Sequence, residues 1–160
     1  MIEITQSELI GIIVRLITAT VGTLGFALIF KVLPRRLPFA MLGGFVTGLV
    51  YELVYVFYPR IAVAAFVSAL VMALYSEAMA RMIHAPTILF LLTGAVPIVP
   101  GNGLYQSIRG LLTDDMVTFE IYVKSTLETL IGITVGLGVA SIVVGIALQV
   151  IKSVRAKIVR

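Results

Sequence analysis

The sequence predicts an all-α integral membrane protein, a bundle of five transmembrane helices whose fourth helix is broken at a P-x-x-P-G motif. Of its 160 residues, 60% are hydrophobic and only 12% are charged, about half the charged share of a soluble domain. The mean hydropathy is +1.13, and long apolar runs such as Ile131–Leu148 show little strand-like alternation. Because a chain in lipid must satisfy its backbone hydrogen bonds internally, these runs are expected to form helices.

Five apolar segments divide a single transmembrane domain that covers residues 1–160. The expected helices are approximately 9–32, 39–58, 61–81, 86–104 and 119–152. Prolines punctuate their connections, at Pro34, Pro38, Pro59 and Pro86. The stretch Asn102–Thr118 is more polar than its neighbours. At about 1.5 Å per residue the fifth helix is longer than a hydrocarbon core of about 30 Å requires, so it should tilt or protrude.

The charges between the helices predict the orientation. One side collects most of the cations: Lys31, Arg35, Arg36, Arg81, Lys152, Arg155, Lys157 and Arg160. The opposite side collects Arg60 and Arg109 together with Glu3, Glu8, Asp114 and Asp115. The positive-inside rule therefore places the N-terminus outside and the C-terminus in the cytoplasm of a multi-pass plasma (inner) membrane protein. The basic tail is expected to face the lipid bilayer's anionic headgroups and not nucleic acid.

Two GxxxG motifs favour close helix packing. Gly44 and Gly48 form the first, and Gly132 and Gly136 form the second. Glycines at this spacing let two helix backbones approach closely in lipid. The motifs indicate packing within the chain, with a contact to another subunit as the alternative.

Ionisable side chains at membrane depth are costly, so each of them needs a partner or a function. Arg15 and Glu52 lie at a similar depth in the first two helices, which allows them to pair. Both are transport-path candidates, although a structural role for Glu52 is equally compatible with the sequence. Glu77 and Arg81 are four residues apart and can form an ion pair on one helix face, either a structural pair or an inner gate.

The run Pro97–Gly101, with the sequence P-I-V-P-G, is the most informative segment. Each proline lacks an N–H and should free the carbonyl four residues earlier, at Thr93 and Val96. Gly101 can then adopt a left-handed turn. Transporters use such interrupted helices to present backbone groups to a substrate, whereas a plain kink is the alternative. The transport-path candidates here are Pro97, Pro100, Gly101, Asn102 and Tyr105.

No pattern typical of an enzyme active site is present, so we expect no catalysis. The sequence has no G-x-S-x-G motif, no P-loop and no cluster of histidine with carboxylates. His84 is the only histidine and cysteine is absent, so neither a metal site nor a cofactor is predicted. Without a nucleotide-binding motif, transport would use a proton or substrate gradient.

The motifs in one region resemble a known family. Glu77–Arg81 reads E-A-M-A-R and is followed by Pro86, by P-I-V-P-G at Pro97–Gly101 and by Tyr105. This order resembles the signature of the threonine/serine exporter family, in which E-x-x-A-R, a proline, P-L-V-P-G and a tyrosine follow one another. Ile98 stands where the family usually has leucine. Outside these motifs the resemblance extends to hydropathy and helix number.

The resemblance is to the second, five-helix half of the fused exporters, which corresponds to the small YjjB-like subunit of split ones. It implies a larger YjjP-like membrane subunit as partner and export of a small polar organic acid or amino acid. Fused members are associated with threonine and serine, and split members with dicarboxylates such as succinate. The residues themselves do not choose between these substrates. A scaffold or assembly subunit without substrate contact is the alternative function.

Overall fold

The computed structural model describes the backbone of residues 6–158 and, within that range, all side chains except those of 7, 151–152 and 154–158. Its helices, in chain order, are α1 (Gln6–Ile29), η1 (Pro34–Arg36), α2 (Leu37–Phe57), α3 (Ile61–Ile83), α4 (Thr87–Ala95), η2 (Val96–Ile98), α5 (Gly101–Leu112) and α6 (Met116–Ile158). No strand occurs within this range, so the predicted all-α class is confirmed. Four helices are long and apolar enough to cross a membrane, or up to five if the bent pair of α4–η2 and α5 is one span.

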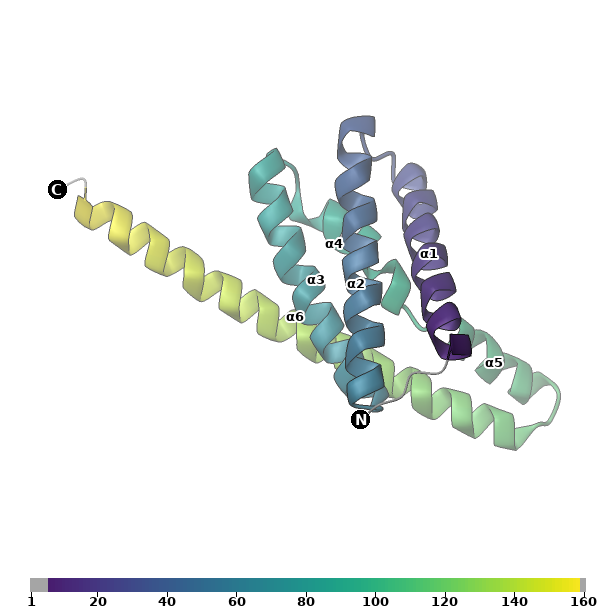
Figure 1. Ribbon diagram of the computed structural model, residues 1–160. Helices are drawn as coiled ribbons and strands as arrows, with labels where there is room; N and C mark the ends of the chain where they lie inside the picture. Colours follow the sequence, from purple (N-terminus) through teal and green to yellow (C-terminus); the bar gives the residue numbers. More distant parts are fainter. Residues whose placement is uncertain (1–5, 159–160) are drawn as a thin grey trace.

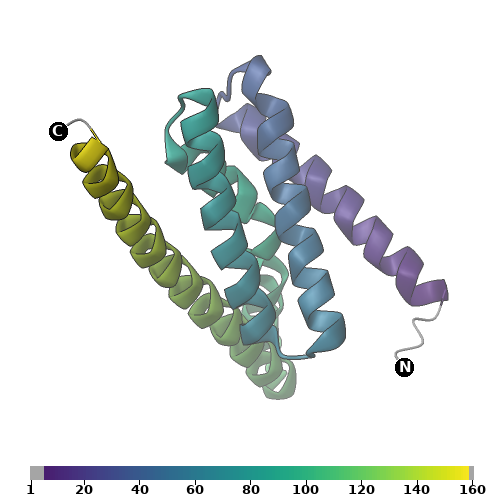
Figure 2. The ribbon, with the colours of Figure 1, turned by 60° about the vertical axis from the view of Figure 1, so that its left-hand side comes forward.

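Helices α1, α2 and α3 alternate in direction, and α4 packs against both α2 and α3 (Figures 1 and 2). A buried cluster of Ala27, Val32, Ala40, Ala80 and Phe90 joins these four helices at one end. Small side chains dominate this core because, in lipid, helices associate through close packing and not through exclusion of water.

A polar residue in the left-handed conformation follows the end of each of three helices, α1, α3 and α5. Lys31, His84 and Asp114 have φ of 53°, 52° and 54°. The backbone N–H of the residue after each of them donates a hydrogen bond to the carbonyl five residues earlier, for example from Ala85 to Ala80 at 2.9 Å. This hydrogen-bond pattern is the Schellman motif, which satisfies carbonyls that a helix end would otherwise leave without donors.

Asp115 caps the start of α6. Its carboxylate accepts the Thr118 backbone N–H at 3.1 Å and the Thr118 hydroxyl at 2.6 Å. The hydrogen bond from the Thr118 side chain is the main reason why the pKa of Asp115 is lowered. The carboxylate therefore has a structural role in the loop between α5 and α6.

The longest helix, α6, has 43 residues and a length of about 64 Å. It crosses α3 obliquely, runs back along α5, and projects with its C-terminal part beyond the other helices (Figure 1). It crosses α3 closely because Gly132 and Gly136 face the α3 backbone. A Cβ at Gly136 would be 2.6 Å from the Phe66 carbonyl oxygen, and one at Gly132 would collide with the Ala62 carbonyl oxygen.

The first GxxxG motif also packs within the chain. A Cβ at Gly44 would overlap the Thr23 hydroxyl of α1. Gly48 has more room, since a Cβ there would be 3.5 Å from Leu16 Cδ2 and 3.8 Å from Pro97 Cβ. All four predicted packing glycines thus lie against other helices of the same chain.

The structure departs from the expected fourth helix, 86–104, at both ends of the interruption. Helix α4 ends at Ala95, and α5 continues to Leu112, into the stretch whose sequence is more polar than that of its neighbours. The physical reason is that α5 is amphipathic. Its small residues Gly103, Ser107 and Gly110 recur every three or four positions and face α6, with Ser107 and Gly110 buried. The two helices meet at an angle of 51°.

Candidate functional site

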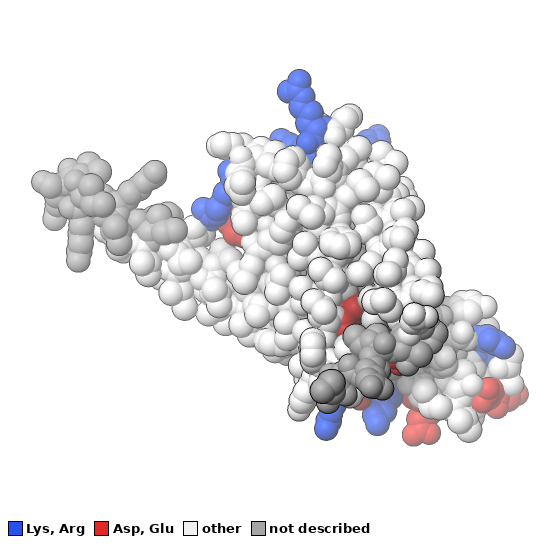
Figure 3. Space-filling model, in the orientation of Figure 1, with Lys and Arg blue, Asp and Glu red and all other residues white. Residues whose placement is uncertain are grey.

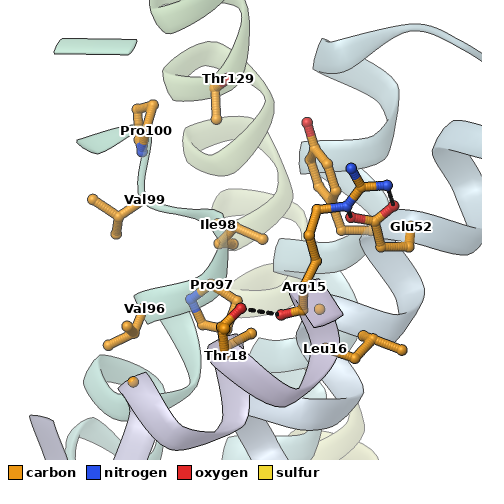
Figure 4. A pocket seen from close by; sticks show the side chains of 14 residues that line it. Arg15, Leu16, Thr18, Glu52, Val96, Pro97, Ile98, Val99, Pro100 and Thr129 are labelled. Atoms are coloured by element: carbon orange, nitrogen blue, oxygen red, sulfur yellow. Dashed lines mark hydrogen bonds and ion pairs between the residues drawn. The ribbon is translucent and has the colours of Figure 1, made fainter. Parts of the chain in front are cut away.

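A cavity of about 470 Å³ lies where α1, α2 and the interruption after α4 meet (Figure 4). Its walls come from four parts of the chain. They are lined by Arg15, Leu16, Thr18, Ala19 and Gly22 of α1, Gly48, Tyr51 and Glu52 of α2, Val96–Pro100, and Thr129 of α6. Helical spacing explains the α1 wall, because positions 15, 18, 19 and 22 share one face.

Arg15 and Glu52 form an ion pair at the cavity wall. Arg15 Nε lies 2.7 Å from Glu52 Oε1, and a second guanidinium nitrogen donates to Oε2 at 3.2 Å. Two parallel contacts of this kind fix the guanidinium and the carboxylate in one plane. The Arg15 side chain is 62% exposed and that of Glu52 is 13% exposed. The carboxylate is therefore the buried member of the pair, and the guanidinium is the accessible one (Figure 4).

The η2 segment and the two residues after it form the opposite wall. Pro97, Ile98 and Pro100 all line the cavity, and Ile98 is buried. The chain stays compact through hydrogen bonds from the Val99 N–H to the Ala95 carbonyl at 3.2 Å and from the Gly101 N–H to the Val99 carbonyl at 2.8 Å. The segment is thus an ordered interruption and not a simple bend of a continuous helix.

Two backbone predictions for this segment are wrong. The Thr93 carbonyl is not free, because the Val96 N–H donates to it when the helix tightens into η2. Gly101 does not adopt a left-handed turn, since no glycine in the described range has positive φ. Pro100, with φ −79° and ψ 54°, makes the change of direction instead, and Gly101 is the first residue of α5.

The predicted path residues divide into two groups. Arg15, Glu52, Pro97 and Pro100 line the cavity. Gly101, Asn102 and Tyr105 do not; they lie on the exposed side of α5, where 63% of Tyr105 is accessible. The helix start at Gly101 turns the chain away from the cavity, which separates the two groups.

Three hydroxyl-bearing residues of the cavity wall were missed by sequence reasoning. They are Thr18, Tyr51 and Thr129. Thr18 follows Arg15 by three positions and Tyr51 precedes Glu52, so proximity to an ionisable group was a usable signal for both. Thr129 likewise follows Glu128, but its helix is distant in the sequence, so nothing local indicated that it shares a cavity with α1 and α2.

Glu77 and Arg81 of α3 lie beside the N-terminal end of α4, whereas the cavity lies beyond its C-terminal end. Arg81 Nε donates to Glu77 Oε1 at 2.8 Å, and Thr87 Oγ1 donates to Glu77 Oε2 at 3.0 Å. Thr87, in the first turn of α4, therefore joins the predicted ion pair as a third residue. The cluster is separate from the cavity, to which α4 connects it.

Helices long and apolar enough to cross a membrane, together with a cavity that contains an ion pair beside an interrupted helix, are the features of a multi-pass membrane protein and are typical of transporters. A family model described as "Threonine/Serine exporter, ThrE" matches residues 15–143, and the chain belongs to this family. The match includes Arg15, Glu52, the Glu77 cluster and the η2 segment. Comparisons with curated proteins and with solved structures find no match.

Proposed function

We propose that this chain is the membrane subunit of a two-component secondary exporter and that the Arg15–Glu52 cavity binds a zwitterionic hydroxy amino acid. The observation that carries the proposal is an ion pair on the wall of a cavity formed by an interrupted helix. Thr87–Ile98 is about 18 Å long, too short to cross a core of about 30 Å, so the interruption lies within the membrane. Irregular backbone at that depth is tolerated where it is buried in protein or lines a water-filled cavity.

The charges of the pair match a zwitterion. Arg15 offers a planar donor for a carboxylate, and Glu52 offers an acceptor for an ammonium group. Without substrate the two side chains neutralise each other. A bound zwitterion would place its carboxylate against Arg15 and its ammonium group against Glu52, so each side chain again faces an opposite charge. A dicarboxylate would place its second carboxylate against Glu52, where like charges repel. The cavity thus favours threonine or serine over succinate.

The distribution of charges supports the proposed orientation. Lys31, Arg35, Arg36 and Arg81 lie in or next to the connections at one end of the bundle, where an Arg36 nitrogen donates to the His84 carbonyl at 3.5 Å. Figure 3 shows mainly cations at this end, acidic and basic groups together at the other, and a largely uncharged band between. Placing the basic end in the cytoplasm follows the positive-inside rule. Of the other charges counted from the sequence, Glu3, Arg160 and the side chains of Lys152, Arg155 and Lys157 lie outside the described residues.

The partner in this proposal is a larger YjjP-like membrane subunit, because the chain resembles one half of the fused exporters. Energy would come from a proton or substrate gradient, since the sequence contains no nucleotide-binding motif. A scaffold subunit without substrate contact is the competing function, and the ion pair on the cavity wall argues against it.

The proposal is tested by export from cells that contain the chain together with its partner subunit. Arg15→Gln and Glu52→Gln should each lower threonine export at least about tenfold, because each leaves the other charge without its partner. The exchange Arg15→Glu with Glu52→Arg restores the pair but reverses the charges presented to the substrate, so export should stay low. Arg109→Gln, an exposed cation on α5 outside the cavity, is the control.

Normal export by the two single variants, at normal amounts in the membrane, would favour the scaffold function. Recovery in the exchanged variant would show that the pair is structural. Succinate export that survives while threonine export is absent would exclude the zwitterion.

A further inference from the structure

We propose that the Tyr51 hydroxyl recognises the side-chain hydroxyl of the substrate and so determines the specificity of the cavity. This inference rests on the proposed function, since it assigns a role within the same site. Tyr51 lines the cavity and directly precedes Glu52 on α2. A substrate whose ammonium group contacts Glu52 would therefore lie near this phenol.

Tyr51 has a hydroxyl that is not already used within the protein. In the part of the chain that the structure describes, it makes no hydrogen bond. The other two hydroxyls of the cavity wall donate to their own helix, Thr18 to the Val14 carbonyl at 2.9 Å and Thr129 to the Ser125 carbonyl at 2.8 Å. Of the three wall hydroxyls, only that of Tyr51 keeps both its donor and its acceptor available to a ligand.

Packing holds the Tyr51 ring in place. The ring lies against a buried cluster of Ala69, Met72 and Ile98, the last of which belongs to η2. The ring also stacks on Tyr55, with a centroid distance of 6.2 Å and an interplanar angle of 5°. A side chain held by both contacts loses little conformational freedom when a ligand binds, which is typical of groups that determine specificity.

The chemistry favours recognition of a hydroxyl. A half-buried phenol beside a small cavity lacks full solvation, and a substrate hydroxyl completes its hydrogen bonding. An analogue of the same shape without the hydroxyl leaves the phenol unpaired, and sites of this kind discriminate strongly against such analogues. Valine and alanine are these analogues for threonine and serine.

The test compares Tyr51→Phe with Tyr55→Phe in the complex with the partner subunit. Tyr55 is on the same helix one turn away, stacks on Tyr51 and does not line the cavity, so it is a matched control. The measurement is the ratio of threonine to valine export, and of serine to alanine export, after equal loading of cells. A ratio does not depend on how much of each variant reaches the membrane.

We expect Tyr51→Phe to lower both ratios about tenfold, the value of one hydrogen bond, and Tyr55→Phe to leave them unchanged. Equal losses for threonine and valine, or unchanged ratios, would overturn the role of Tyr51. Those results leave the proposed function intact as long as Arg15→Gln still lowers threonine export at least about tenfold. A wild-type complex that exports neither amino acid would refute both proposals.

Discussion

Thr87, in the first turn of α4, donates a hydrogen bond from Oγ1 to Glu77 Oε2 of α3 at 3.0 Å. Arg81 occupies the other oxygen of the same carboxylate. Glu77 therefore fixes the beginning of α4, whose far end leads into η2 and the cavity wall. The Arg81 side chain is 52% exposed and that of Glu77 is 23% exposed, so this cluster lies at an accessible end of the bundle.

The Glu77 cluster predicts coupled effects on export. Glu77→Gln and Arg81→Gln should each reduce export, and the double variant should lose less than the sum, because both remove the same contact. An exposed pair contributes only about 0.3–0.5 kcal/mol to stability, so the loss should be in function and not in the amount of folded protein. Initial export rates divided by membrane amounts are the measurement. Large and fully additive losses would show that the two residues act separately.

Close packing of α6 on α3 predicts that Gly136 does not tolerate a side chain. In Gly136→Ala the added methyl group would meet the Phe66 carbonyl oxygen at 2.6 Å, and backbone cannot move aside as a flexible side chain can. Overpacking of this kind costs about 1–3 kcal/mol, which thermal unfolding of the protein in detergent should detect. Gly138→Ala on the same helix is the control, since nothing lies within 4 Å of its added carbon. Similar melting temperatures for the two variants would contradict the observed contact.

The cavity boundary predicts which positions a substrate protects. The chain has no cysteine, so single cysteines report without background. A cysteine at Val99, which lines the cavity, should react with a water-soluble thiol reagent, and threonine should slow that reaction. Cysteines at Asn102 and Tyr105 are outside the cavity and should show no protection. Protection at Tyr105 but not at Val99 would place the substrate along α5.

The prolines of the interruption predict a loss of export without loss of insertion. Pro97→Ala and Pro100→Ala each restore a backbone N–H, which favours continued helix through the cavity wall. Export should fall while the amount in the membrane stays normal. Normal export by both variants would mean that the interruption serves only to bend the chain.

The charge distribution predicts the topology. A reporter fused after Arg160 should lie in the cytoplasm, and one inserted beside Asp114 should lie outside, because the Lys31 and Arg81 connections belong to the basic end. Enzymatic reporters that work on only one side of the membrane provide the measurement. A cytoplasmic signal beside Asp114 would contradict the orientation and place the cavity on the opposite side.

The sequence by itself determined the class of this protein. Apolar runs of this length have one stable form in lipid, so composition alone leads to membrane helices. The residues Glu77 and Arg81 could be paired because their contact lies within one helix turn. Arg15 and Glu52 could be matched by depth, since each needs an opposite charge in a medium of low polarity.

Only the tertiary structure decided which residues share the cavity. Asn102 and Tyr105 are near Pro100 in sequence but lie outside the cavity, whereas Thr129 is far along the chain and lies within it. The cause is the rotation of each helix about its own axis, because the helices packed against it decide which face is buried. Helix α5 turns its small residues toward α6, since Gly103 and Gly110 allow a close approach. The orientation of Tyr51 likewise depends on its packing against Ile98, which is distant in the sequence. Contacts between distant segments fix such rotations, and local sequence does not encode them.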